Sequence, residues 1–241
     1  MPPRVLCALV LGLTGIGQLS AGDIQGTVIV KHKLTRRKVT ASSGAYERGR
    51  PVVLGSCPFD KDSLAYERSH VVVYVDGEPP SDCTSAPIQQ KVQQKMEQKD
   101  REFQPDLLTI PCGSTVSFPN LDPIFHNVFS LSKPKTFDLG NYNKGQARSV
   151  TFLKPGIVLV NCRLHTNMTA AIVITPNQWS SRADADGRFV LRGVPAGIHT
   201  LIAWHKAAGF LRQTVTVSDS RTAIVEFPIP LDENGVPVAH R

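Results

Sequence analysis

The chain has 241 residues, of which 41% are hydrophobic and 20% charged, and its formal net charge is +7. This length and composition are typical of a globular protein with one or two hydrophobic cores, and they exclude a largely disordered chain. The basic residues are scattered rather than collected into one stripe, which argues against nucleic acid as a partner.

The N-terminus has the pattern of a secretory signal peptide. Arg4 precedes an apolar run over residues 5–17, and small residues precede Gly22. This run is shorter than the ~20 residues that a membrane-spanning helix requires. We therefore predict that residues 1–21 are removed on export, that the mature protein is periplasmic or secreted, and that it has no membrane span. An uncleaved N-terminal anchor is the alternative.

The segment 22–86 is expected to contribute two β-strands. Residues 24–30 alternate in polarity, and residues 71–75 form a continuous β-branched and aromatic run, which is strongly β-prone. Irregular structure is expected between them, up to about Ser69, and a linker is expected over residues 76–86. Five basic residues after the first strand form either a solvated hairpin or a docking patch: Lys31, Lys33, Arg36, Arg37 and Lys38.

The segment 87–176 is expected to form a β-rich domain. The polar stretch 87–102 favours an exposed strand over a short helix, and residues 113–120 read as a turn followed by a strand. Pro155 and Gly156 mark a second turn. The β-branched strand that follows, residues 157–160, would deliver Cys162 to the end of a sheet.

Four side chains of this segment together indicate a copper site: His126, Cys162, His165 and Met168. One thiolate and two imidazoles with a weak axial thioether are the ligand set of blue-copper electron-transfer sites. Cys162, His165 and Met168 recur at every third residue, so one tight loop can present all three on one side. His126 must then arrive from a separate strand. Taken singly, such residues are more often disulfide, core or hydrogen-bonding groups, but together they predict one copper ion per chain.

Residues from about Phe103 to Thr175 resemble a cupredoxin, the family of plastocyanin, pseudoazurin and amicyanin, and the short Cys-x2-His-x2-Met loop is most similar to that of amicyanin. The resemblance implies a type 1 copper site with its ligands at His126, Cys162, His165 and Met168.

Three positions near the ligands bear on this resemblance. Asn127 matches the asparagine with which the family ties its two ligand loops together, a role that fixes ligand orientation. Arg163 follows the cysteine where a small or hydroxyl residue is usual, and Asn161 precedes it where an aromatic or apolar residue is frequent. Neither departure removes a ligand.

The segment 177–241 has a further succession of turns and strands. These are a turn and strand at 185–191, a turn at 193–197, and strands at 198–204, 213–217 and 222–227.

Residues 186–197 resemble the carboxypeptidase regulatory-like module, a small transthyretin-like β-sandwich. That module begins with a Gly-x-Val strand, here residues 26–28, and an apolar strand, here residues 71–75. The resemblance implies that the copper domain is inserted between early and late strands of one sandwich; a separate C-terminal sandwich is the alternative. The expected fold class is therefore all-β, a cupredoxin Greek-key β-sandwich plus a second small β-sandwich.

Five cysteines are present. Cys7 lies in the signal peptide and Cys162 in the copper site, which leaves Cys57, Cys83 and Cys112 in an oxidising compartment. A bridge between Cys57 and Cys83 is preferred, because both lie in Pro-, Ser- and Asp-rich loops outside the strands of the copper domain. Cys112 would then be unpaired or would pair with another chain.

Two further features are interpreted as structural. The sequon at Asn167 would place a glycan beside Met168, so it is read as a false positive. Trp204 is expected to fill a sandwich core, with His205 at the end of the strand.

These features imply an exported single-electron carrier rather than an enzyme. His126 would be buried, His165 would be the exposed edge for electron entry and exit, and Phe125, Val128 and Leu164 would exclude water from the metal. The basic charge favours redox protein partners with acidic docking surfaces.

Three alternatives remain open. A copper oxidase or nitrite reductase needs further centres built from paired histidines, and the chain has no His-x-His pair. Copper carriage predicts Met- or His-rich loops, whereas the chain has three methionines. The third is a structural, surface-binding sandwich with a vestigial cupredoxin domain.

Overall fold

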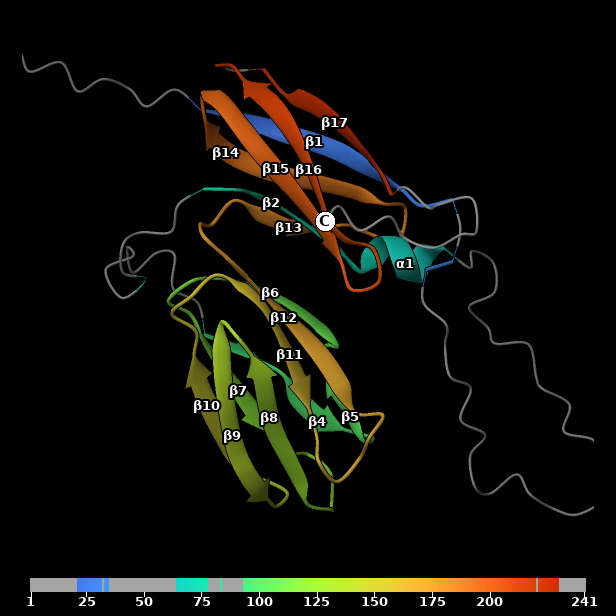
Figure 1. Cartoon of the computed structure of the whole chain (residues 1–241), viewed down its shortest axis with the longest axis vertical. Helices are drawn as coiled ribbons and strands as arrows, with labels where there is room; N and C mark the ends of the chain where they lie inside the picture. The colour runs from blue at the N-terminus through green and yellow to red at the C-terminus, as the bar shows by residue number, and fades with distance from the viewer. Residues whose placement is uncertain are drawn as a thin grey trace, which may run out of the picture.

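The computed structural model describes residues 21–31, 33–34, 64–77, 83, 93–219 and 221–229. Within these ranges the regular secondary structure is almost entirely β-strand, which confirms the predicted all-β class. The strands form two β-sandwiches stacked along the long axis of the molecule (Figure 1). Residues 1–20 of the predicted signal peptide lie outside the described residues. No helix in the described part of the chain is long and apolar enough to cross a membrane.

The first sandwich combines strands from both ends of the described chain. Its strands are β1 (Ala21–Ile29), β2 (Val71–Val75), β13 (Ser180–Arg182), β14 (Arg188–Pro195), β15 (Gly197–His205), β16 (Gly209–Val217) and β17 (Ala223–Pro228). One sheet has the order β14-β1-β17, with β1 antiparallel to β14 and parallel to β17. The other has the order β13-β2-β15-β16. The chain thus leaves this sandwich after β2 and returns to it at β13, which is the connectivity that an inserted domain requires.

The second sandwich is built from the residues in between. Its strands are β3 (Gln93–Lys95), β4 (Glu97–Lys99), β5 (Glu102–Gln104), β6 (Leu107–Pro111), β7 (Thr115–Pro119), β8 (His126–Ser132), β9 (Lys135–Tyr142), β10 (Ala147–Thr151), β11 (Gly156–Asn161) and β12 (Thr169–Thr175). A five-stranded sheet, β6-β12-β11-β8-β9, faces a three-stranded sheet, β10-β7-β3, and β4 and β5 form a hairpin.

The two sandwiches share a hydrophobic junction because β2 is buried on both faces. Alternate residues of a strand point to opposite faces. Val71, Val73 and Val75 pack in the core of the first sandwich, whereas Val72 and Tyr74 face the second. The junction core consists of Val72, Tyr74, Leu107, Ala171, Val173, Ile202 and Trp204. Trp204 is thus a core residue, but in the junction rather than inside one sandwich. The strand predicted at 71–75 is confirmed as β2.

A short helix, α1 (Ala65–Ser69), lies beside this junction and was not expected from the sequence, which predicted irregular structure there. At its C-terminal end, the His70 ring contacts the Asp106 carboxylate at 3.0 Å, and Tyr66 donates a hydrogen bond to the same group at 3.2 Å. Inside the fold, Glu67 contacts His205 at 3.2 Å. The helix therefore supplies polar contacts to both sandwiches.

The predicted disulfide is wrong. Cys83 is bonded to Cys112, and both side chains are buried in the core of the second sandwich. Composition suggested that Cys83 lies in a linker, but loop composition carries no information about which loops meet in space. The bridge holds the segment before β3 against the turn that follows β6. Cys57, its predicted partner, lies outside the described residues.

Other sequence predictions hold in part. The polar stretch 87–102 does contain strands, β3, β4 and the start of β5. The strand expected at 213–217 is longer, because β16 begins at Gly209 and pairs along its whole length with β15. Of the basic cluster, Lys31 and Lys33 are exposed, and Arg36, Arg37 and Lys38 lie outside the described residues.

Removal of the disulfide is expected to destabilise the second sandwich. The bridge joins residues 29 apart in sequence, and closure of a loop of this size stabilises the folded state by roughly 3 to 4 kcal/mol through the entropy of the unfolded chain. Cys83→Ser combined with Cys112→Ser should lower the free energy of unfolding by that amount in urea denaturation. A double variant as stable as the parent would show that the bridge does not form.

The His70–Asp106 contact should make stability depend on acid pH. The hydrogen bond from His70 holds the pKa of Asp106 below its usual value of 3.8. A lowered folded-state pKa adds stability above the unfolded-state value, and that stability is lost as the pH falls through the folded-state pKa. Because Asp106 is 45% exposed, Asp106→Asn should cost about 0.5 to 1 kcal/mol near neutral pH. Denaturation midpoints of the two proteins should converge as the pH falls below the folded-state pKa of Asp106; a difference that stays constant throughout the acid range would contradict this.

Candidate metal centre

The predicted ligands come from two parts of the second sandwich. His126 is the first residue of β8, and the loop 162–168 joins β11 to β12. The pairing of Asn161 with Thr169 brings the two ends of this loop together. The amide of Cys162 then donates to the carbonyl of Met168 at 3.2 Å, and the amide of Met168 donates to the carbonyl of His165 at 3.0 Å. The loop is therefore a tight turn closed by backbone hydrogen bonds.

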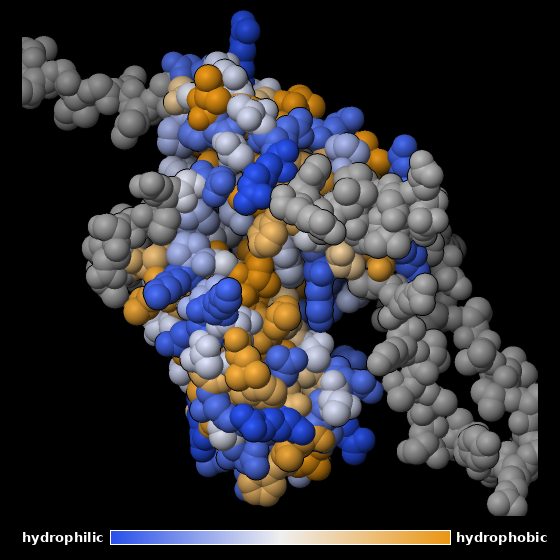
Figure 2. Space-filling model, in the orientation of Figure 1, coloured by the Kyte–Doolittle hydropathy of each residue, from blue (hydrophilic) through white to orange (hydrophobic). Residues whose placement is uncertain are grey.

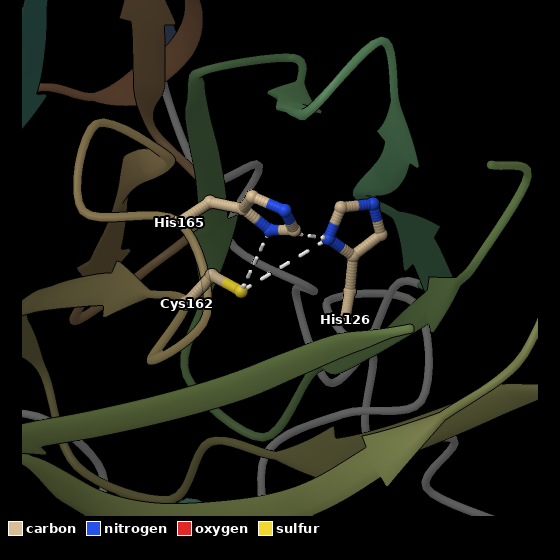
Figure 3. A group of neighbouring side chains, drawn as sticks. All are labelled: His126, Cys162 and His165. Carbon is tan, nitrogen blue, oxygen red and sulfur yellow. Dashed lines mark hydrogen bonds between the residues drawn. The ribbon is translucent and has the colours of Figure 1, made fainter. Parts of the chain in front are cut away.

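Three ligand side chains point at one another (Figure 3). The Nδ1 atoms of His126 and His165 are 3.1 Å apart. The Cys162 Sγ atom lies 4.0 Å from Nδ1 of His126 and 3.7 Å from Nδ1 of His165. His126 and Cys162 are buried, and His165 is partly exposed.

This triangle fits a single metal ion. Metal–nitrogen bonds of about 2.0 Å and metal–sulfur bonds of about 2.3 Å span donor separations up to about 4.0 Å between nitrogens and about 4.3 Å between nitrogen and sulfur. All three observed separations fall within these limits. Two imidazoles and one cysteine sulfur are also donors that copper accepts.

A buried carboxylate sets the tautomer of His126. Its Nε2 atom lies 2.8 Å from Oδ2 of Asp122. A carboxylate only accepts, so Nε2 carries the proton and donates it, and Nδ1 keeps its lone pair. That lone pair faces His165 and Cys162. The orientation and tautomer of His126 therefore suit a metal ligand before any metal binds.

Asp122 is itself held by a hairpin turn. The amides of Asp100 and Arg101 donate to its two carboxylate oxygens at 2.7 and 2.9 Å. Both residues have positive φ, 57° and 59°, in the turn between β4 and β5, and this conformation aims their amides at one acceptor. Burial would raise the pKa of Asp122, but the bonds from Arg101, His126 and Asp100 outweigh it and keep the pKa below its usual range.

The environment of His165 favours its neutral ring. Burial is the main cause that lowers its pKa, and the proximity of His126 and Arg101 lowers it further. A neutral imidazole is the form that binds metal ions.

Asn127 adjoins the first ligand and contacts the second. Its backbone amide donates to Sγ of Cys162 at 3.5 Å. Its side-chain amide does not reach the ligand loop directly, but donates to Oδ1 of Asp138 at 2.7 Å. The amide of Gly140, with the Asn127 side chain, holds the pKa of Asp138 below its usual range.

Met168 is fully buried in the same core cluster as Cys162. Its thioether thus lies within the second sandwich at the end of the ligand loop. All four predicted ligands are in one region, with three in mutual contact and the fourth in the core beneath the loop.

The apolar residues expected to shield the metal divide into two groups. Val128 is fully buried, whereas Phe125 and Leu164 are about half exposed. That they exclude water from the metal stays a prediction. Phe125 precedes His126, and Leu164 precedes His165. Leu121, in the same loop as Phe125, is also exposed. Figure 2 shows hydrophobic side chains at the surface of the lower sandwich.

Comparisons with known proteins give structural likeness alone. Neither protein-family models nor curated protein sequences match this chain. Among solved structures, it is similar to a purple cupredoxin from Nitrosopumilus maritimus, with 22% identity over 34% of this chain and 98% of that protein and a TM-score of 0.31.

Two other solved structures are similar at the same level. An amicyanin variant shares 19% identity over 42% of this chain and 97% of that protein, with a TM-score of 0.32. A copper-containing nitrite reductase from Thermus scotoductus SA-01 shares 21% identity over 37% of this chain but 29% of that protein, with a TM-score of 0.33. At these TM-scores the likeness carries no weight on its own, and the assignment of a metal rests on the side chains described above.

Two functional side chains escaped the sequence analysis, Asp122 and Asp138. Asp122 precedes His126 by four residues, and that spacing within the loop is the one local signal that was present. Asp138 lies on another strand, and nothing near it in sequence points to the site.

Loss of the Asp122 carboxylate should destabilise the metal-free protein. Asp122→Ala would leave three buried or partly buried donors, the amides of Asp100 and Arg101 and Nε2 of His126, without an acceptor, at a cost of about 3 kcal/mol. Urea denaturation would measure this. Asp186→Ala is the matched control, because Asp186 is 68% exposed in a surface pair with Arg188. Equal effects of the two substitutions would contradict the role given to Asp122.

Proposed function

We propose that this protein is an exported single-electron carrier with one type 1 copper ion per chain. The observation that supports this most directly is the triangle of His126, Cys162 and His165, in which the carboxylate of Asp122 already fixes the buried imidazole of His126 with its lone pair facing the other donors. Preorganised donors of this kind minimise the rearrangement that accompanies a change of oxidation state.

Each ligand has a distinct role in this proposal. Nδ1 of His126 and of His165 and the Cys162 thiolate would form the trigonal plane, and the thioether of Met168 would be the weak axial ligand. Bound copper would supply one-electron redox chemistry at this position. The protein holds the donors in place, and the amide of Asn127 at 3.5 Å from the Cys162 sulfur tunes how strongly that sulfur donates charge.

The electron would enter and leave through His165, the partly exposed ligand. It would be accepted from one redox protein and given to another. Phe125, which precedes His126, and Leu164, which precedes His165, expose apolar surface, and Arg163, which precedes Leu164, is 60% exposed. We propose redox partners that bring apolar contact and an acidic docking surface to this part of the molecule.

The domain assignment belongs to the same proposal. Residues 87–176 would be a cupredoxin domain, inserted in a carboxypeptidase regulatory-like sandwich built from residues 22–86 and 177–241. The pairing of β1 and β2 with strands that follow β12 supports it. The N-terminal pattern supports export to the periplasm or the outside of the cell. We propose a carrier rather than a catalyst because the chain contains no His-x-His pair for further copper centres.

The visible spectrum tests this function. Addition of Cu(II) to the purified protein should give an intense band near ~600 nm that bleaches on reduction, because a copper-bound thiolate produces it. Cys162→Ser should abolish the band while circular dichroism shows an unchanged fold. His199→Gln, which alters a histidine of the first sandwich that contacts the carbonyl of Pro195, should retain it. A folded parent protein without this band would overturn the proposal.

A further inference from the structure

The residue that follows the ligand cysteine is connected to Asn127 through a third side chain, Asp138. Oδ1 of Asp138 accepts from the side-chain amide of Asn127 at 2.7 Å, and Oδ2 lies 3.0 Å from the Arg163 guanidinium. Asn127 follows His126, and Arg163 follows Cys162. We call these three side chains, Asn127, Asp138 and Arg163, the Asp138 bridge.

The strands bring the members of the bridge into line. Phe129 on β8 pairs with Asn161 at the end of β11 on one side and with Asp138 on β9 on the other. Arg163, two residues beyond Asn161, crosses above the Phe129 ring, with its guanidinium carbon 4.9 Å from the ring centre. It thereby spans the width of β8 to reach Asp138, and the aromatic face supports the extended side chain.

A β-bulge on β9 provides a further hydrogen bond to Asp138. Between Asn127 and Phe129 the pairing shifts, so that β9 contains one residue more than β8. Gly140 in this bulge has a φ of +66°, which glycine adopts at little cost, and its amide donates to Oδ1 of Asp138 at 2.9 Å. The carboxylate is therefore fixed from its own strand as well as by its two partners.

Asn127 depends on this carboxylate. The side chain is 2% exposed, and its carbonyl oxygen has no hydrogen-bond partner among the described residues. The bond to Asp138 is thus what anchors the buried amide, and the same residue donates its backbone amide to the Cys162 sulfur. A disturbance of Asp138 would reach the sulfur through Asn127.

We propose that Asp138 and Arg163 are positioning residues that fasten the ligand loop to strand β8 and thereby maintain the hydrogen bond from Asn127 to the Cys162 sulfur. The chain uses a two-step connection, Asn127 to Asp138 to Arg163, where the cupredoxin resemblance implies a tie between the two ligand loops. This inference deepens the proposed function, and its electrochemical part rests on it.

The first measurement uses the metal-free protein and is independent of copper. The rate of alkylation of Cys162, resolved by peptide mass mapping, reports how well its sulfur is held and covered. Asp138→Ala should raise this rate about tenfold and Arg163→Ala about threefold, because the first removes charge-assisted bonds to a buried amide and the second a partly exposed ion pair. Arg163→Lys, which keeps the charge, should restore most of the protection. Arg188→Ala, which breaks an exposed pair with Asp186 in the other sandwich, is the matched control and should leave the rate unchanged.

The second measurement is the reduction potential of the copper-loaded protein, for which a bridge and a simple charge effect predict opposite signs in Asp138→Ala. A hydrogen bond to the thiolate favours the reduced metal, so its loss lowers the potential. Under the proposal both Asp138→Ala and Arg163→Ala lower the potential. If the two charges acted only through the Coulomb field, Asp138→Ala would raise it and Arg163→Ala would lower it.

The inference would be overturned if Asp138→Ala raised the reduction potential, Arg163→Ala lowered it, and neither changed the alkylation rate. Should Asp138→Ala fail to fold, the alkylation rates of Arg163→Ala and Arg163→Lys still confirm or refute the bridge, because Arg163 is exposed. If the parent protein forms no blue copper site, the proposed function fails, while the alkylation rates of the metal-free variants still confirm or refute the bridge.

Discussion

The buried carboxylate of Asp122 is the contact on which the arrangement of the metal donors depends. It receives two backbone amides from the turn between β4 and β5 and the imidazole Nε2–H of His126, so that turn and the start of β8 meet at its two oxygen atoms. Because a carboxylate can only accept, this single group settles both the direction in which the His126 ring faces and which nitrogen keeps its lone pair. The desolvation of Asp122 opposes its charge, and the converging donors outweigh that cost.

The loop that carries the other donors is braced differently. It is short, its two ends are paired strand residues, and it leads directly into β12. This strand is buried along nearly its whole length, because one face packs in the core of the second sandwich and the other in the junction with the first. A strand enclosed on both sides has little freedom to shift. The first sandwich therefore restrains the ligand loop through β12, although none of the predicted ligands belongs to it.

Local patterns in the sequence account for part of this structure. The strands β2, β11 and β15 could be predicted because their apolar residues follow the period of the faces they bury, and the four donors because their spacing suits one loop and one separate strand. Strand β9 could not: it lies at the edge of its sheet, alternates weakly, and is fixed mainly by its pairing with β8. The pairing of Cys83 with Cys112 depends on a meeting of loops that no local pattern encodes.

The same distinction explains why the charged groups around the site were missed. Asp122 and Asp138 look like ordinary polar residues of a loop and an edge strand, and their importance arises from donors on other elements that the fold brings to them. Arg163 was visible as a departure from the cupredoxin pattern, but its consequence could not be derived without Asp138. That residue lies on β9, where it pairs with Phe129 of β8, and Arg163 crosses the Phe129 ring to reach it. An unusual residue beside a ligand is thus interpretable only together with the residue that it contacts. Here that contact is Asp138, which is 25 positions earlier in the chain, on a bulge that a glycine permits.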